Sequence, residues 1–97
     1  MSTKKIIALL QVAQKAIDHH AASRRASAAK MAYYDSCSEW KDNQGYDRFQ
    51  KLDRNGEDWE RMMTHSHSHL IEYRKAKRAE YNAKRRLTTA IRKAEVA

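Results

Sequence analysis

The sequence predicts an all-α protein: a long helical hairpin with a short connecting helix, in a loose three-helix arrangement. Its 97 residues include no proline and only two glycines, Gly45 and Gly56. Sandwiches and barrels of β-strands need frequent Gly and Pro turns, so this near-absence favours long helices. Alanine, lysine, arginine and glutamate, all good helix formers, fill much of the rest of the chain. A chain of this length makes one domain at most, so we expect a single helical domain over residues 1–97.

The first predicted helix begins near Lys4, where Ser2 or Thr3 can cap it, and extends to about Lys41. The stretch from 21 to 32 is rich in alanine, and its small side chains would let another helix approach closely, within the hairpin or in a second copy. The sequence Asp-Asn-Gln-Gly at 42–45 predicts the end of this helix, because glycine readily adopts the left-handed conformation. Apolar residues recur with helical spacing at Ile6, Leu10, Ala13 and Ile17.

The second half of the chain predicts a short helix and then a long one. The short helix is expected over Tyr46–Leu52, followed by a turn at 53–56. The long helix has Asn55 as its expected N-cap and acidic residues in its first turn, where the helix dipole favours anions. No breaker occurs before Ala97. Whether this helix bends at the His65–His69 stretch is left open, because serine and histidine are middling helix formers.

Charge and cysteine content restrict the class of partner and the compartment. The formal net charge is +8, from 20 basic and 12 acidic residues, and residues 72–97 hold nine basic and three acidic side chains. This balance favours polyanions or acidic protein surfaces as partners. The single cysteine, Cys37, excludes an intramolecular disulfide and is typical of a reducing cytoplasm. The apolar run at 6–10 is too short for a signal peptide or a membrane span. We expect a cytoplasmic protein with no membrane partner.

Three local patterns suggest chemistry but favour simpler interpretations. His65 and His69 have the one-turn spacing of two metal ligands, but zinc needs three or four, so we interpret them as surface histidines. The sequence from Asp53 to Glu57 resembles the start of a calcium loop, but Thr64 stands at the twelfth position, where such a loop requires a glutamate. We therefore interpret it as a turn with a helix cap. Cys37 lies on an apolar helical face with no glycine-rich loop nearby, which favours a buried side chain over a nucleophile. We therefore expect no enzyme activity, no cofactor, no metal and no small-molecule substrate.

The dense aromatic and methionine residues of the middle third, and the basic helix after them, form the predicted partner-binding site. We expect Trp40 and Met62 in the core and leave Trp59 and Tyr46 open between core and interface, since aromatic side chains are enriched in both. The basic charges wrap around the last helix, which is compatible with a solvated face without a partner, with an acidic protein surface or with nucleic-acid phosphates. A nucleic-acid-binding protein is thus the alternative function. The predicted partner-binding residues are Tyr46, Phe49, Trp59, Met63, Tyr73, Arg74, Lys77, Arg78, Lys84 and Arg85.

The chain also resembles the anti-RecBCD recombination proteins of lambdoid phages. The resemblance covers the whole length and is carried by MSTKKIIALL at 1–10, WKDN at 40–43 and FQKLD at 49–53. It implies a small helical phage protein, in the cytoplasm of the bacterial host, that binds the RecBCD helicase–nuclease through its RecC subunit. Binding would modulate the enzyme, protect phage DNA ends and promote phage recombination, with DNA contacted only indirectly or weakly. A host prolyl isomerase is a further implied partner, although this chain has no proline for such an enzyme to hold.

Overall fold

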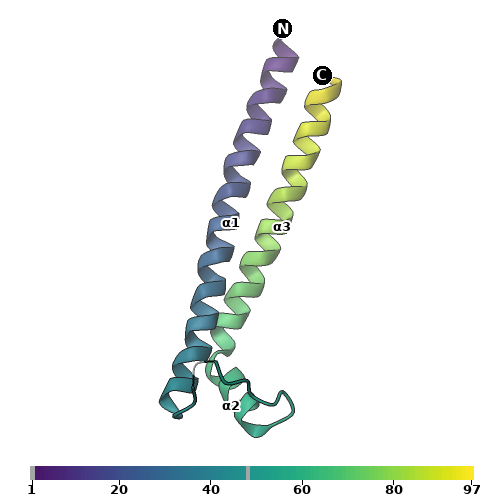
Figure 1. Cartoon of the computed structure of the whole chain (residues 1–97). Helices are drawn as coiled ribbons and strands as arrows, with labels where there is room; N and C mark the ends of the chain where they lie inside the picture. Colours follow the sequence, from purple (N-terminus) through teal and green to yellow (C-terminus); the bar gives the residue numbers. More distant parts are fainter. Residues whose placement is uncertain (1, 48) are drawn as a thin grey trace. The chain divides into compact units, whose positions relative to one another are not determined.

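The computed structural model describes residues 2–47 and 49–97, which form three helices and no strand (Figure 1). Helix α1 spans Thr3–Asn43, α2 spans Glu57–His65 and α3 spans His67–Val96. The predicted all-α class, with two long helices and a short one between them, is confirmed. Residue contacts divide the chain into unit 1, Met1–Ala26 with Lys75–Ala97, and unit 2, Ser27–Arg74. Each unit is described by itself, and the single domain expected over 1–97 stays a prediction.

Both ends of α1 lie where the sequence predicts them. At the start, Ser2 Oγ accepts a hydrogen bond from the backbone N–H of Lys5 at 3.2 Å, which is an N-cap contact. At the other end, Gly45 adopts a φ of +80°, and its N–H donates to the carbonyl of Asp42 at 3.1 Å. The N–H of Tyr46 then reaches back to the carbonyl of Lys41 at 2.9 Å, satisfying another terminal carbonyl.

In unit 1 the first part of α1 packs against the last part of α3 along a seam of alanines. Buried alanines lie on both helices, and the ammonium of Lys5 donates to the carbonyl of Ala94, which fixes the two chain ends side by side (Figure 1). The residues of α1 that are buried or half-buried recur at alternating spacings of three and four, the pattern of a coiled-coil seam. The buried alanines are Ala8, Ala22, Ala26, Ala83, Ala90 and Ala94.

The large aliphatic side chains of α1 do not join this seam. Ile6 is 47% exposed, Leu10 is 65% exposed and Ile17 is 63% exposed, while Ala8 and Ala22 are buried. Alanine at matching positions of both helices lets the backbones approach closely, so the small residues take the interior of unit 1. The spacing of the aliphatic residues therefore predicted the helix correctly, and these residues lie on its exposed face. No described helix has a window apolar and long enough to cross a bilayer.

Unit 2 has a core of larger side chains. Trp40 at the end of α1 and Met62 in α2 are buried, as predicted from the sequence. The hydroxyls of Ser36 and Ser66 lie 2.9 Å apart in the interior and satisfy each other. Because a buried hydroxyl without a partner costs free energy, this pair lets two polar side chains sit inside the unit.

The short helix expected over Tyr46–Leu52 is absent: the described residues of this segment form turns and irregular backbone, and Arg48 lies outside the described residues. Hydrogen bonds from side chains account for the difference, one within the segment and one from the end of α1. Asp47 accepts the N–H of Phe49 with its side chain at 3.2 Å, and the ammonium of Lys41 donates to the carbonyl of Gln50. Aspartate side chains compete in this way with helical backbone hydrogen bonds.

The long second-half helix predicted from the sequence is split at Ser66. Ser66 has φ −98° and ψ 5°, and its N–H donates to the carbonyls of Met62 and Thr64, which ends α2. Gly56, not Asn55, is the N-cap of α2, because the N–H of Asn55 donates to the Asp53 carboxylate at 3.0 Å in the preceding turn. The sequence left open whether this helix bends at the histidines, and the structure shows that it is interrupted there, at Ser66.

Candidate interaction surfaces

Unit 1 carries an open groove of about 610 Å³ between α1 and α3. Among its described lining residues are four basic side chains, three amides and a threonine, and no carboxylate. Every polar side chain in it can therefore donate a hydrogen bond, which suits an anionic ligand. The lining residues are Gln11, Gln14 and Lys15 from α1 and Asn82, Arg85, Arg86, Thr89, Ala90 and Lys93 from α3. We call this set the cationic groove.

A second, smaller hollow of about 450 Å³ shares two residues with the cationic groove, Asn82 and Arg86. It adds one further basic side chain, Arg25, and one acidic side chain, Asp18. The two hollows therefore adjoin along the same two helices, and the second is not free of carboxylates.

The two units differ sharply in charge. Unit 1 contains thirteen lysines and arginines against three aspartates and glutamates, a formal charge of +10. Unit 2 contains seven against nine, a formal charge of −2, and the two values together give the +8 of the chain. The cationic groove thus lies in a unit whose whole field attracts anions.

The structure places four of the predicted binding residues in unit 1: Lys77, Arg78, Lys84 and Arg85 are all exposed. Of these four, Arg85 lines the cationic groove. The prediction missed Arg86, Lys93 and the α1 residue Lys15. The sequence did contain a signal for Arg86 and Lys93, because each directly precedes a residue of the apolar row of the last helix, Leu87 and Ala94. Lys15 required knowledge of which face of α1 meets α3.

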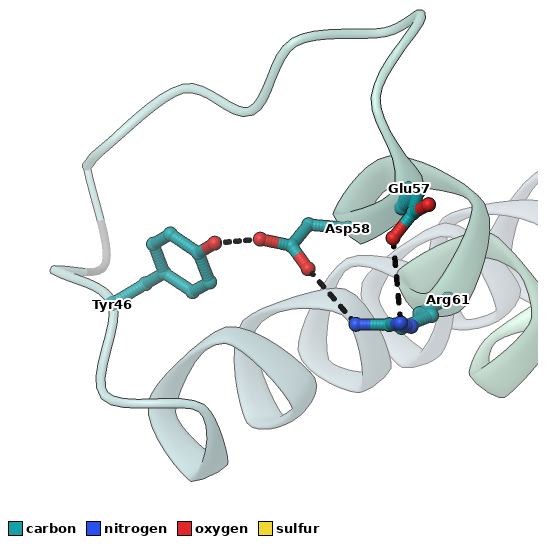
Figure 2. Close-up of polar contacts among 4 residues, drawn as sticks. All are labelled: Tyr46, Glu57, Asp58 and Arg61. Atoms are coloured by element: carbon teal, nitrogen blue, oxygen red, sulfur yellow. Dashed lines mark hydrogen bonds and ion pairs between the residues drawn. The ribbon is translucent and has the colours of Figure 1, made fainter.

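The other six predicted residues lie in unit 2, where Tyr46 is tied to α2 (Figure 2). Its hydroxyl donates to the carboxylate of Asp58, and its ring stacks on Trp40 with centroids 6.1 Å apart. Arg61 contacts Asp58 at 3.6 Å and Glu57 at 3.5 Å. These ion pairs are solvent-exposed and contribute little stability by themselves. Tyr46 therefore links Trp40 at the end of α1 to Asp58 at the start of α2.

Met63 and Tyr73 also make contacts inside unit 2. The hydroxyl of Tyr33 lies 3.4 Å from the sulfur of Met63, and the Tyr33 ring stacks on Tyr73 with centroids 6.2 Å apart. Both predicted residues are half-buried, and the adjacent Arg74 is exposed. Met63 and Tyr73 thus take part in the internal packing of unit 2 and offer a partner only part of their surface.

Phe49 and Trp59 are the aromatic residues of the predicted set with the most obvious freedom to meet a partner. Phe49 is 87% exposed on the irregular segment, where nothing about the fold requires an aromatic ring. Trp59 is half-buried, and the guanidinium of Arg54 lies over its ring at 5.5 Å. It lines a hollow of about 430 Å³ together with Met62. Aromatic side chains are enriched at protein interfaces, so these two residues are candidates for contact with a partner.

The hydrogen bond to Asp58 raises the pKa of Tyr46 above its ordinary value of 10.0, with burial as a second cause. Burial and the neighbouring Cys37 raise the pKa of Tyr33. The folded protein keeps these protons where the unfolded chain loses them, so their stabilising effect is complete below pH 10 and is lost as the pH rises further.

We expect Tyr46→Phe to lose stability less steeply than the wild-type protein between pH 9 and pH 11, because the phenol that must stay protonated is gone. Urea unfolding followed by circular dichroism at several pH values measures this slope. Equal slopes for Tyr46→Phe and wild type would show that the contact with Asp58 does not persist in solution.

The histidine stretch is divided between two helices. His65 ends α2, whereas His67 and His69 belong to α3, and all three side chains are exposed. Within residues 2–47 and 49–97, no group of three or more His, Cys, Asp or Glu is arranged to hold a metal ion. Cys37 is half-buried beside Tyr33.

Comparisons with known proteins give no relative from which a role could be transferred. Protein-family models, curated protein sequences and solved structures were each compared with this chain, and none of them matches it. The described residues thus define the protein by its structure alone. It is an all-α protein with one basic unit, whose two helices pack through alanines, and one slightly acidic unit that is rich in aromatic residues.

Proposed function

We propose that this chain is a non-catalytic binding protein that attaches to an acidic macromolecular surface through the cationic groove of unit 1. The observation that carries the proposal is the composition of the groove: Lys15, Arg85, Arg86 and Lys93 with no carboxylate among the described lining residues. Uncompensated positive charge costs stability through self-repulsion. An anionic partner that covers the groove would relieve this repulsion on binding.

The resemblance to anti-RecBCD recombination proteins supplies the proposed partner, the host RecBCD helicase–nuclease, contacted through RecC. In this proposal the groove attracts and orients an acidic surface, and Phe49 with Trp59 in unit 2 supplies apolar contacts. Steering by charge raises association rates, whereas desolvated aromatic anchors supply most of the specific binding energy. Binding modulates the enzyme so that phage DNA ends survive and recombine, in the cytoplasm of the host cell. A host prolyl isomerase is a second proposed partner.

The first experiment is capture of RecBCD from a bacterial lysate on the tagged protein, detected with antibodies against each subunit. We expect retention of RecB, RecC and RecD at physiological salt and their loss at about 1 M salt, where charges are screened beyond about 3 Å. Failure to retain RecBCD would remove this partner from the account.

The cationic groove also favours a second candidate function, direct binding of nucleic acid. Phosphates along a strand would meet a row of basic side chains on two helices. A titration of bare duplex DNA separates the two functions. Micromolar or tighter affinity with a steep loss between 50 and 200 mM salt would support nucleic-acid binding. Negligible DNA binding, together with retention of RecBCD, is the outcome that we expect.

A further inference from the structure

All the amide side chains of unit 1 line the cationic groove. They are Gln11 and Gln14 on α1 and Asn82 on α3, and the sequence of unit 1 contains no other asparagine or glutamine. The α1 wall of the groove is thus mainly amide, whereas the α3 wall carries three of the four basic side chains. A surface that needed only positive charge would not gather every amide of the unit beside it. The amides therefore indicate a ligand with more to recognise than its negative charge.

These amides differ from the basic side chains in that they accept hydrogen bonds as well as donate them. Gln14 donates an N–H to the carboxylate of Asp18 at 3.0 Å, and its carbonyl oxygen remains an acceptor in the groove lining. An acceptor oxygen repels the oxygens of a phosphate or a carboxylate, but it can accept a hydrogen bond from a peptide N–H. The lining therefore matches a ligand that carries N–H donors together with negative charge.

An extended acidic peptide segment has both features. Its backbone presents free N–H and C=O groups, and its aspartates and glutamates carry the charge. In a helix the backbone groups are bonded to one another, so they would leave the amides of the groove without partners. A docked helix would also need an apolar contact face, and Ala90 is the one apolar side chain among the described lining residues. Like charges repel along an acidic segment, which keeps it extended in solution.

The dimensions of the groove also suit such a segment. Along α3 the lining extends from Asn82 to Lys93, about 16 Å of helix, which equals about five residues of extended chain. Its volume of about 610 Å³ lies within the range of about 300–1,000 Å³ that is usual for pockets holding small ligands. Sites for single-stranded nucleic acid usually add aromatic rings on which bases stack, and the described lining residues include none.

We propose that the cationic groove binds an extended acidic peptide segment. The amides of Gln11, Gln14 and Asn82 pair with the backbone of the segment, and the basic side chains pair with its carboxylates. This inference rests on the proposed function and narrows it, because the acidic surface of the partner then supplies a strand, a loop or a tail to the groove. Binding of nucleic acid in the same groove is the outcome that the test must exclude.

Fluorescence anisotropy of short labelled anions with the full chain tests the class of ligand. The probe is an octapeptide of alternating glutamate and serine with blocked termini. Two matched probes carry the same charge: the octapeptide N-methylated at each serine, which lacks those N–H donors, and a five-nucleotide oligodeoxythymidylate. At about 50 mM salt we expect the octapeptide to bind at least about fivefold more tightly than either, because each lost hydrogen bond costs about twofold to tenfold in affinity. Equal or tighter binding of a matched probe, or no binding of the octapeptide at about 1 mM protein, would overturn the proposal.

Gln11→Met combined with Asn82→Leu removes two of the amides at nearly constant volume and charge, and Thr88→Val is the matched control. Thr88 is an exposed polar residue of α3 outside the groove lining. Gln14 is kept because its loss would also free the carboxylate of Asp18. We expect the double variant to bind the octapeptide about tenfold more weakly and the oligonucleotide as before, with unchanged helix content by circular dichroism, and the control to bind both probes like wild type. An equal loss for both probes, or no loss for the octapeptide, would contradict the role assigned to the amides.

The same measurements separate this inference from the proposed function. Retention of RecBCD by a chain that shows no preference for the octapeptide would support the function and reject the extended segment. A preference for the octapeptide without retention of RecBCD would support the extended segment and reject RecBCD as its source.

Discussion

Arg85→Glu combined with Arg86→Glu is expected to weaken binding of the acidic partner by about 100-fold, or about 2.7 kcal/mol. Both arginines line the cationic groove, so in the proposed function the change replaces two donors to an anionic surface with two repelling carboxylates. Biolayer interferometry with immobilised RecBCD at 0.15 M salt measures the affinity. Both the loss of steering and the new repulsion lower it.

The matched control for this variant is Lys77→Glu combined with Lys84→Glu. It makes the same change in net charge on the same helix and in the same unit, at exposed residues outside the groove lining. We expect a loss of less than tenfold for the control. If the two double variants weaken binding equally, then net charge and not the groove determines attachment, and the groove has no special role.

Trp40→Ala is expected to lower the free energy of unfolding by about 3–5 kcal/mol, a large part of the 5–15 kcal/mol that stabilises a typical domain. Trp40 is 8% exposed, and its ring stacks on Tyr46 where α1 ends. Removal of the indole leaves a cavity and takes away the ring on which Tyr46 stacks. Urea unfolding followed by circular dichroism at 222 nm measures the change without depending on tryptophan fluorescence.

Trp59→Ala provides the comparison for Trp40→Ala, because Trp59 is half-buried and covered on one face by Arg54. We expect it to cost less than half as much stability as Trp40→Ala. In the proposed function it should nevertheless weaken binding of the partner, whereas its stability cost stays small. A loss below about 1 kcal/mol for Trp40→Ala would show that unit 2 does not depend on this ring.

Both ends of α1 were predicted from the local sequence, whereas the N-cap of α2 was not. Gly45 ends α1 with a positive φ and was identified from residue type, and Ser2, which caps its start, was one of the two caps that the sequence offered, with Thr3. The prediction was wrong over Tyr46–Leu52, because its described residues are held by contacts with Lys41 and Asp58, which lie in other segments. Tertiary contacts of this kind leave no pattern in the local sequence.

The candidate surfaces could be predicted only in part, because they too depend on contacts between segments that are distant in the sequence. The concentration of positive charge near the C-terminus was visible in the sequence, but the groove forms only where two distant segments pack. Which residues share it depends on the face of α1 that α3 covers, and the sequence offered two such faces with the same spacing. The larger side chains marked the exposed face, whereas alanines formed the buried one.

The central claim, that the cationic groove meets RecC, is tested most directly by photo-cross-linking. A benzoylphenylalanine placed at Thr89 lies in the groove, and the same probe at the exposed neighbour Thr88 lies outside the groove lining. With purified RecBCD and no DNA, the account predicts that the Thr89 probe attaches to RecC and the Thr88 probe does so far less. Labelling from Thr88 but not from Thr89, or no labelling of RecC from either, would contradict it.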